Sequence, residues 1–330
     1  MCSSRSGSEK DGIPGISFAK RCILKPQPHV PWARTMVLNP AIIADPENKR
    51  ILYMLFRTTG PGTDVRIPNH PLPYPIYLGF AESRDNGQNW SFDWSRPAMS
   101  PRLDYDQEDF IRNSFRDKRM FDYSNGCIED PRLFNFEGDV YMTAACRAFP
   151  PGPYWEKDDP RQCMPGWAME NPALFGEAVR QNRTVTMLYK VNLRALSAGD
   201  YDGAFEVICP LHDPEICDNR DVVPFPRRLM ISCSPKIVCL HRPQEPWSYE
   251  CGKGLSAPSI FIACADRWED FYNGSAENRV LAVPKFEWEA NRIGSSWTPL
   301  ELEKGLWLLP YHGKQDDFVG YTQSFMLLRE

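Results

Sequence analysis

Short apolar runs separated by proline- and glycine-rich turns extend along this whole chain, and they constrain its fold more than any other feature. The 330 residues include 31 Pro and 21 Gly, a density that breaks a chain into many short elements. Helical periodicity is scarce, and one short helix is expected within Trp167–Arg180, with Pro172 in its first turn. We therefore expect an all-β protein with two long loops, at Asp104–Met120 and Ala148–Asn182.

Eight apolar runs bounded by turn residues have the length and composition of β-strands. They are Met36–Ile43, Ile51–Arg57, Ile76–Ala81, Val140–Cys146, Val185–Val191, Lys236–Leu240, Ser259–Ala263 and Leu306–Tyr311. Their distribution, without the long helices of βαβ units, predicts a propeller or a sandwich with a separate C-terminal domain. A degenerate repeat favours the propeller, because a strand, a polar turn and a closing aromatic residue recur at Gly79–Trp90, Leu188–Tyr201 and Ile262–Phe271.

Composition and charge exclude several classes of protein. Hydrophobic residues make up 42% of the chain, so a packed core is expected, and no apolar run is long enough to span a membrane. The net charge of −5 lacks the basic excess with which proteins bind nucleic acid. Eleven cysteines without zinc spacing predict reduced thiols and no metal site, and the polar N-terminus predicts a cytoplasmic protein.

The sharpest local signal lies in Asn125–Leu133, which contains the sequence Glu-Asp-Pro-Arg. Pro131 disfavours helical backbone at Asp130, so we expect this acid in extended backbone at a strand entrance. A carboxylate beside an apolar wall and under an arginine can act as a general acid or base. The alternative is that Asp130 caps a turn and pairs with Arg132, and the local motif alone favours this alternative.

Three arginines lie on or beside predicted strands: Arg57, Arg220 and Arg242. Arginine recognises phosphate and carboxylate through planar, bidentate hydrogen bonds, so several arginines in one cavity would form an anion site. Each of them alone is more typical of a surface ion pair. Phosphate-binding glycine loops, nucleophile elbows and zinc-peptidase motifs are lacking, so nucleotide binding, serine hydrolysis and metallopeptidase chemistry are unsupported.

An ordered set of segments resembles glycoside hydrolase family 130, the β-mannoside phosphorylases and related β-mannosidases. The set consists of Leu38–Ile42, Leu52–Arg57, Gly79–Trp90, Gly126–Arg132, Arg220–Pro226, Leu240–Pro243 and Ile293–His312. The resemblance rests above all on Glu-Asp-Pro-Arg together with Trp307–Gly313. It implies a single five-bladed β-propeller over residues 35–330, preceded by an N-terminal arm of residues 1–34 that contacts a neighbouring subunit in a homo-oligomer.

The same resemblance implies roles for individual residues. It implies that Asp130 is the catalytic acid. The sugar-binding residues that it implies are Asn39, Arg57, His312 and Asp317 (or its neighbour Asp316). The phosphate-binding residues that it implies are Arg220, Arg242 and Arg183. The implied reaction is inverting phosphorolysis of mannosyl-glucose or β-1,4-manno-oligosaccharides to mannose 1-phosphate, with inorganic phosphate as co-substrate and no cofactor.

Two alternatives remain open at this stage. An inverting glycosidase needs an acid and a base that activates water, whereas phosphate is already an anionic nucleophile and needs only cations around it. One acid with several arginines therefore favours phosphorolysis over hydrolysis. A hydrolase would need further carboxylates, for which Glu170 and Glu177 are candidates. A non-catalytic glycan-binding propeller, in which the same aromatic residues and arginines bind sugar, is the second alternative.

Overall fold

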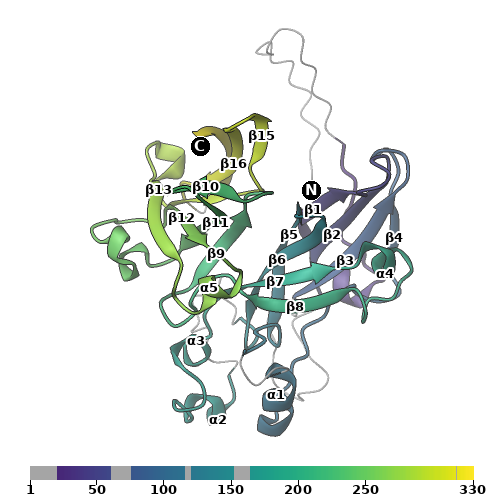
Figure 1. Ribbon diagram of the computed structural model, residues 1–330. Helices are drawn as coiled ribbons and strands as arrows, with labels where there is room; N and C mark the ends of the chain where they lie inside the picture. Colours follow the sequence, from purple (N-terminus) through teal and green to yellow (C-terminus); the bar gives the residue numbers. More distant parts are fainter. Residues whose placement is uncertain (1–20, 61–75, 116–119, 152–163, 317) are drawn as a thin grey trace.

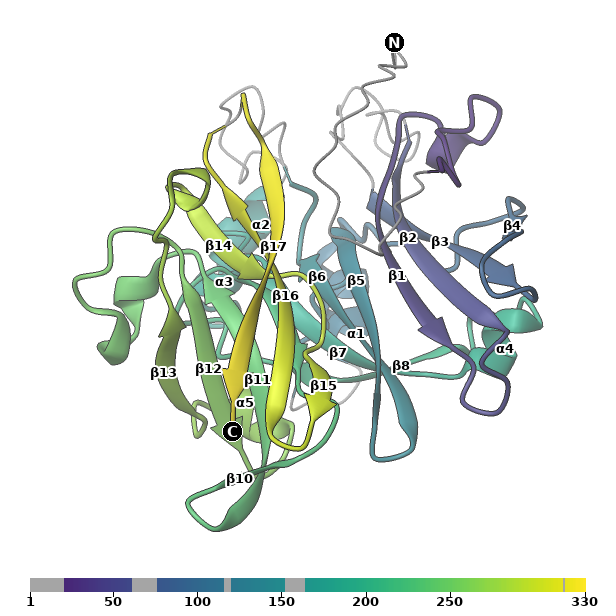
Figure 2. The ribbon, with the colours of Figure 1, turned by 90° about the horizontal axis from the view of Figure 1, so that it is seen from above.

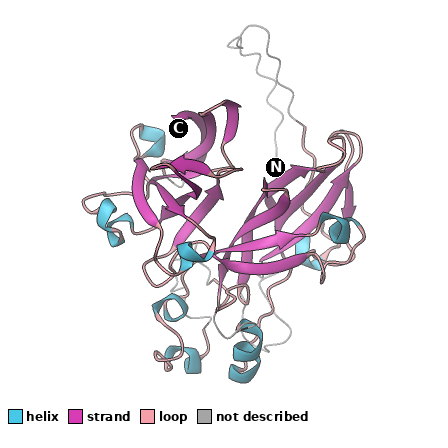
Figure 3. Ribbon diagram, in the orientation of Figure 1, coloured by secondary structure: helices cyan, strands magenta, loops and turns pink. Residues whose placement is uncertain are grey.

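The computed structural model describes residues 21–60, 76–115, 120–151, 164–316 and 318–330. They form four antiparallel sheets that follow one another around a common centre (Figures 1 and 2). Helices are short and lie outside the sheets (Figure 3). The fold is an all-β propeller.

The first two sheets each contain four strands in chain order. Sheet 1 consists of β1 (Met36–Ala44), β2 (Leu52–Thr59), β3 (Ile76–Ser83) and β4 (Ser91–Asp93), and sheet 2 of β5 (Cys127–Phe136), β6 (Asp139–Arg147), β7 (Val185–Val191) and β8 (Phe205–Pro210). In both sheets the first strand lies nearest the centre of the ring (Figure 2).

The last two sheets differ in their outer strands. Sheet 3 has β9 (Asn219–Pro224) and β10 (Leu229–Ile231) on one edge of β11 (Ser234–Pro243), followed by β12 (Ile260–Ala265) and β13 (Glu277–Ala282). Sheet 4 has β14 (Arg292–Ser295) and β15 (Leu300–Glu303) on one edge of β16 (Leu306–Lys314), and β17 (Tyr321–Arg329) on the other. Sheet 4 thus ends, in the described chain, at its third strand from the centre.

In the part of the chain that the structure describes, helices are short pieces that precede or connect strands. They are α1 (Gln107–Ser114), α2 (Gly166–Met169), α3 (Glu177–Arg180), α4 (Leu193–Ser197), α5 (Glu269–Tyr272) and the 3₁₀ turns η1 (Pro31–Ala33), η4 (Pro246–Ser248), η5 (Glu250–Gly252) and η6 (Glu287–Glu289). The segment expected to hold one helix holds two, α2 and α3, because Pro172 between them cannot continue a helix from α2. In the described residues no helix is long and apolar enough to cross a membrane.

Each of the eight predicted strands falls on an observed strand, two of them starting one residue early, at Ile51 and Ser259, and nine further strands were not predicted. The predicted number of blades is wrong: the structure has four, not five. The long segments before β5 and β7 contribute α1, α2 and α3 rather than another sheet. Aromatic side chains hold these segments, which the sequence predicted as loops: Phe110 of α1 stacks on Phe149 at 4.9 Å and contacts Phe175 at 5.6 Å. These rings extend the core between sheets 1 and 2, so the segments are buried as loops and helices. The 17 strands of the described chain are all taken up by the four sheets, and sheet 3 uses five of them.

Separate hydrophobic clusters join successive sheets. Leu55 and Ile128 belong to the cluster between sheets 1 and 2, Leu188 and Val222 to the one between sheets 2 and 3, and Leu240 and Trp307 to the one between sheets 3 and 4. Among the described residues no comparable cluster joins sheet 4 to sheet 1, although Trp297, between β14 and β15, packs against the cluster of sheets 1 and 2.

Candidate active site

The innermost strands of three sheets carry the same local feature, a polar residue in left-handed backbone. The φ angles are 47° at Asn39 in β1, 54° at Asp130 in β5 and 55° at Asp221 in β9. In each case the strand register is interrupted at or beside this residue, as expected for a β-bulge. Asn and Asp tolerate left-handed backbone better than other residues with side chains, and a bulge re-aims the side chain.

The bulge corrects one expectation about Asp130. The sequence predicted extended backbone at a strand entrance, whereas Asp130 lies inside β5 with a positive φ. Pro131 disfavours only the right-handed helical region for the residue before it. The left-handed region therefore stays available to an aspartate. With this backbone, the bulge directs the Asp130 carboxylate away from the hydrogen-bonded ladder of β5 and β6.

Asp130 is held by residues of sheet 1. Asn39 donates a hydrogen bond from Nδ2 to Asp130 Oδ1 at 2.6 Å, and Arg57 donates from Nη1 to the same oxygen at 3.0 Å. Arg57 Nη1 also lies 2.8 Å from Oε2 of Glu129. The Asp130 side chain is 21% exposed, against 6% for Glu129, so Asp130 is the carboxylate of this pair that a ligand can reach.

The charges around Asp130 favour its ionised form. Burial pushes the pKa of Asp130 upward, but Arg57, Arg132 and the hydrogen bond from Asn39 together outweigh burial and lower this pKa. In the ligand-free protein Asp130 is therefore a carboxylate at neutral pH, and it needs a proton before it can act as an acid.

Asp221 forms a second centre, shared by three sheets. Arg132 donates from Nη2 to Asp221 Oδ1 at 2.6 Å, and Arg242 donates from Nε to Oδ2 at 2.6 Å. Nε2 of His312 in β16 lies 3.4 Å from Oδ2. Burial alone would raise the pKa of Asp221, yet Arg242, His312 and Arg132 hold it well below its usual value.

Gly294 in β14 makes room for this second centre. A Cβ atom at this position would lie 2.2 Å from Oδ2 of Asp221 and 2.9 Å from Nε2 of His312, closer than real Cβ atoms approach other groups. Arg132 donates a further hydrogen bond to the carbonyl oxygen of Ser295 at 3.3 Å. The close packing at Gly294 and the hydrogen bond to Ser295 therefore place β14 of sheet 4 in direct contact with the Asp221 centre.

Arg220 extends the cluster on the other side of Glu129. Its Nε donates to Oδ1 of Asp218 at 3.3 Å, and its Nη1 lies 3.7 Å from Oε1 of Glu129. Arg147 Nη2 lies 3.7 Å from Oδ2 of Asp218. Burial of Asp218 is outweighed by Arg220 and Arg147 and by hydrogen bonds from Thr184, which lower its pKa to about 2.

The contacts join these groups into one network. It contains five guanidinium groups and four carboxylates: Arg57, Arg132, Arg147, Arg220 and Arg242 with Glu129, Asp130, Asp218 and Asp221. Positive charge is in excess, and the 29% exposed side chain of Arg220 makes part of that charge accessible. Such a site suits an anion bound beside a reachable carboxylate.

Most residues singled out in the sequence meet in this network: Asn39, Arg57, Asp130, Arg220, Arg242 and His312. Arg183 borders it, because its Nη1 donates to the carbonyl oxygens of Pro214 and Glu215 while the next residue, Thr184, donates its N–H to Asp218 at 3.0 Å. Asp317 lies outside the described residues, and its neighbour Asp316 caps the turn before β17.

Two members of the network, Arg147 and Asp218, were not singled out from the sequence. Arg147 directly follows the predicted strand Val140–Cys146, so the reasoning that selected Arg57 at a strand end would also have selected it. The role of Asp221 as a shared partner was missed as well. Its signal is the third occurrence of an Asn or Asp near the start of an innermost strand, after Asn39 and Asp130.

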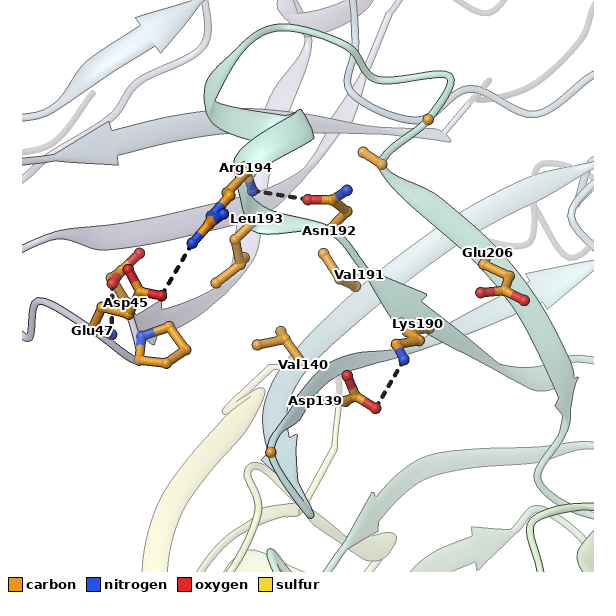
Figure 4. Close-up of a pocket in the computed structure, with 14 residues that line it drawn as sticks. Asp45, Glu47, Asp139, Val140, Lys190, Val191, Asn192, Leu193, Arg194 and Glu206 are labelled. Carbon is orange, nitrogen blue, oxygen red and sulfur yellow. Dashed lines mark hydrogen bonds and ion pairs between the residues drawn. The ribbon is translucent and has the colours of Figure 1, made fainter.

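A cavity of about 610 Å³ lies elsewhere, at the opposite ends of β1 and β5 from the bulges (Figure 4). Figure 4 shows charged side chains around it, but they pair with one another: Lys190 with Asp139 at 2.8 Å and Arg194 with Glu47 at 3.1 Å. The network of five arginines and four carboxylates around Asp130, called the bulge network below, has an excess of cations and a carboxylate that a ligand can reach. It is the better candidate active site.

Comparison with known proteins identifies the fold. No protein-family model matches the chain, and no curated protein matches it in sequence. Among solved structures, a β-1,2-mannobiose phosphorylase from Listeria innocua is similar, with a TM-score of 0.53 and 16% identity over 88% of this chain and 71% of that one. A protein from Bacteroides ovatus described as a candidate glycoside hydrolase is similar with a TM-score of 0.51 and 14% identity over 93% of this chain and 75% of that one. At these identities the similarity establishes a shared fold.

Proposed function

We propose that this protein is a carbohydrate-processing enzyme that cleaves β-mannosides by inverting phosphorolysis and releases mannose 1-phosphate. The observation that carries the proposal is Asp130, the most exposed carboxylate of the network, held by Asn39 and Arg57 where cations are in excess. The resemblance to glycoside hydrolase family 130 and the structural similarity to a mannobiose phosphorylase support the same substrate class.

The residues fit the parts of this reaction. Asn39 and Arg57 bind the mannosyl ring, and Arg220 binds phosphate while the buried Arg242 adds positive charge behind it. A phosphate oxygen attacks the anomeric carbon on the face opposite the leaving oxygen, and the bond to that oxygen breaks. Asp130 supplies the proton that the leaving oxygen takes up, relayed through a sugar hydroxyl. The products are mannose 1-phosphate and the shortened sugar.

Phosphate binding also explains how Asp130 becomes an acid. The free carboxylate is ionised because guanidinium groups surround it. A phosphate on Arg220 adds negative charge to the network and offsets part of that positive potential, which raises the pKa of a nearby carboxyl group. In this proposal phosphate therefore has two roles: it is the nucleophile, and its negative charge raises the pKa of Asp130 so that the carboxylate can take up a proton.

Hydrolysis is the competing function, and it requires a second carboxylate to activate water. The two candidates for this role are differently placed. Glu177 accepts hydrogen bonds from Arg180 at 2.7 Å and Gln181 at 2.6 Å on its own short helix, and Glu170 is exposed at the end of α2. These contacts give Glu177 a local structural role and do not connect it to the network around Asp130.

One assay separates the functions. The protein is incubated with mannosyl-glucose or β-1,4-manno-oligosaccharides, with and without inorganic phosphate, and the products are separated. We expect mannose 1-phosphate to form only with phosphate, because the other carboxylates of the network, Glu129, Asp218 and Asp221, are each paired with arginine and are therefore weak bases for activating water. Free mannose in both samples would identify a hydrolase, and sugar binding without turnover would identify a glycan-binding propeller.

Replacing Arg220 by alanine tests phosphate recognition. Charge-assisted hydrogen bonds to phosphate contribute about 1.5–3 kcal/mol each, so Arg220→Ala should raise the KM for phosphate by about 10- to 100-fold. Arg57→Ala should instead weaken use of the sugar. Arg194→Ala is the matched control, since Arg194 makes an exposed ion pair at the opposite cavity and its loss should leave both KM values unchanged. A parental phosphate KM in Arg220→Ala would remove Arg220 from the phosphate site.

A further inference from the structure

Arg132 lies two residues after Asp130 in β5, and its guanidinium group contacts residues of three sheets. Its Nη1 donates to the backbone carbonyl oxygen of Asp130 at 3.2 Å. Its Nη2 donates to Oδ1 of Asp221 in sheet 3 at 2.6 Å and to the carbonyl oxygen of Ser295 in sheet 4 at 3.3 Å. Arg132 is buried, so its guanidinium group serves these protein acceptors and is little accessible to a ligand.

The hydrogen bond to the Asp130 carbonyl oxygen acts on the bulge that carries the Asp130 carboxylate. In the pairing of β5 with β6, Asp130 and Pro131 occupy the place opposite a single residue, Ala144. Asp130 has a φ of 54°, a left-handed backbone that persists where surrounding contacts hold it. Arg132 supplies such a contact at the carbonyl group of Asp130 itself.

Asp221 fixes the direction of the Arg132 guanidinium group. Its Oδ1 accepts from Arg132, while its Oδ2 accepts from Arg242 at 2.6 Å and lies 3.4 Å from Nε2 of His312. A planar guanidinium group that donates to a buried carboxylate held on its other side has little freedom to turn. Arg132 therefore links the backbone of Asp130 to a firmly held group in the neighbouring sheet.

The side-chain contacts of Asp130 do not replace this link when substrate is bound. The two groups that donate to the carboxylate, Asn39 and Arg57, are also the groups that bind the mannosyl ring in the proposed function. A sugar that binds them competes with Asp130 for their hydrogen bonds. The contact of Arg132 with the carbonyl oxygen is buried behind the bulge and involves no sugar-binding residue.

We propose that Arg132 is a positioning residue: by bridging the carbonyl oxygen of Asp130 and the carboxylate of Asp221, it keeps the bulge in the conformation that aims the Asp130 carboxylate at the sugar. The inference rests on the proposed function, in which Asp130 is the acid. Arg132 acts through Asp130 and binds neither the sugar nor phosphate. Its replacement should therefore lower kcat and leave the KM values for mannoside and phosphate close to those of the parent.

Arg132 also acts on Asp130 through its charge, and this effect can be measured separately. The charged groups around Asp130 are Arg57, Arg132, Arg220, Glu129 and Asp221. Loss of one cation from this set raises the pKa of Asp130 and moves the alkaline limb of the pH profile of kcat/KM to higher pH. Arg132→Gln removes both the charge and the bridge, whereas Arg132→Lys keeps the charge but lacks the planar group that spans two acceptors.

The kinetic test compares both variants with the parent in phosphorolysis of mannosyl-glucose or β-1,4-manno-oligosaccharides. We expect kcat to fall about 10- to 100-fold in both, because a displacement of about 1 Å at a reacting group can cost about 100-fold in rate. The alkaline limb should move in Arg132→Gln alone. A folded Arg132→Lys variant with parental kcat, or a raised KM with parental kcat, would overturn the proposal.

Thr143→Val is the matched control. Thr143 lies opposite Arg132 in the ladder, is buried, and donates from Oγ1 to the carbonyl oxygen of Val222 in sheet 3 at 2.9 Å. Its replacement by the isosteric valine also removes a buried contact between sheets 2 and 3, but it leaves Asp130 and Asp221 untouched. We expect kcat, both KM values and the pH profile to remain parental. An equal loss of kcat in Thr143→Val would assign the effect of Arg132 to general packing of the two sheets.

Crystal structures of the parent and of Arg132→Lys provide a readout that does not depend on activity. Arg132→Lys keeps a cation beside Asp221 and is the variant expected to fold, which circular dichroism checks. We expect the Asp130 carboxylate in this variant to be displaced from its position beside Asn39. An Asp130 that superimposes on the parent would overturn the positioning role. A parent without phosphorolysis would instead overturn the proposed function, and the two failures are thus distinguished.

Discussion

Asp130→Asn is expected to lower the turnover number for mannoside phosphorolysis by about 10²- to 10⁴-fold, the usual contribution of a general acid. The amide keeps the shape of the side chain and its contact with Asn39, but it has no proton to supply to the leaving oxygen. The measurement is the initial rate of mannose 1-phosphate release at saturating phosphate. Thermal unfolding followed by circular dichroism checks that the variant is folded.

Asp139→Asn provides the matched control for this substitution. Asp139 lies in the same sheet, at the opposite end from the bulge, and forms a half-exposed ion pair with Lys190 at 2.8 Å. Its replacement should leave the rate within about twofold of the parent, as expected for a surface pair. If Asp130→Asn behaved in the same way, Asp130 would be a structural residue of the bulge and the catalytic assignment would fail.

Asp221→Ala is expected to lower the free energy of unfolding by about 3–5 kcal/mol, since it removes the shared partner of two buried arginines. Arg132 and Arg242 each lie 2.6 Å from this carboxylate, and both lose a charge-assisted hydrogen bond. Equilibrium unfolding in urea at pH 7 measures the loss. Asp266→Ala, which removes the exposed partner of Lys236, should cost only about 0–1 kcal/mol.

The pH dependence provides an independent check on Asp221. Its pKa in the folded protein is well below the value of about 3.9 in an unfolded chain, so its contribution is complete above pH 4 and is lost as the pH falls further. The stability difference between the parent and Asp221→Ala should therefore shrink on acidification below pH 4. A difference that stays constant from pH 7 to pH 3 would contradict the ion-pair explanation.

Local patterns located eight of the seventeen strands in the described chain and missed the number of sheets. Apolar runs such as Val185–Val191 became strands because each is short, rich in β-branched and aromatic residues and bounded by turns. The number of blades depends on how the segments between strands pack, which no local pattern encodes. Here Phe110, Phe149 and Phe175 meet, although Phe110 is far from the other two in the chain, and they pack two long segments that were already predicted as loops. The fifth blade was implied only by the family resemblance.

The candidate site likewise contains some features that the sequence indicated and others that it did not. Asn39 and Asp130 are 91 residues apart, and their contact follows from the packing of sheet 1 against sheet 2, which only the family resemblance suggested before the structure. Pro131 indicated that the backbone at Asp130 is restricted, whereas Asp221 is followed by Val222, which gives no such indication. Its left-handed bulge could be recognised only once β9 was placed against β11.

The bulge network also has a mechanical consequence. Arg57 connects sheet 1 to Asp130 in sheet 2, and Arg132 connects sheet 2 to Asp221 in sheet 3. Each joint therefore combines a charged contact near the centre with the apolar cluster between the same two sheets. A ligand that draws Arg57 away from Asp130 removes one of the two ion pairs of Arg57 across the joint between sheets 1 and 2, since Arg57 also pairs with Glu129. The apolar cluster keeps the two sheets together while the site changes its charge contacts.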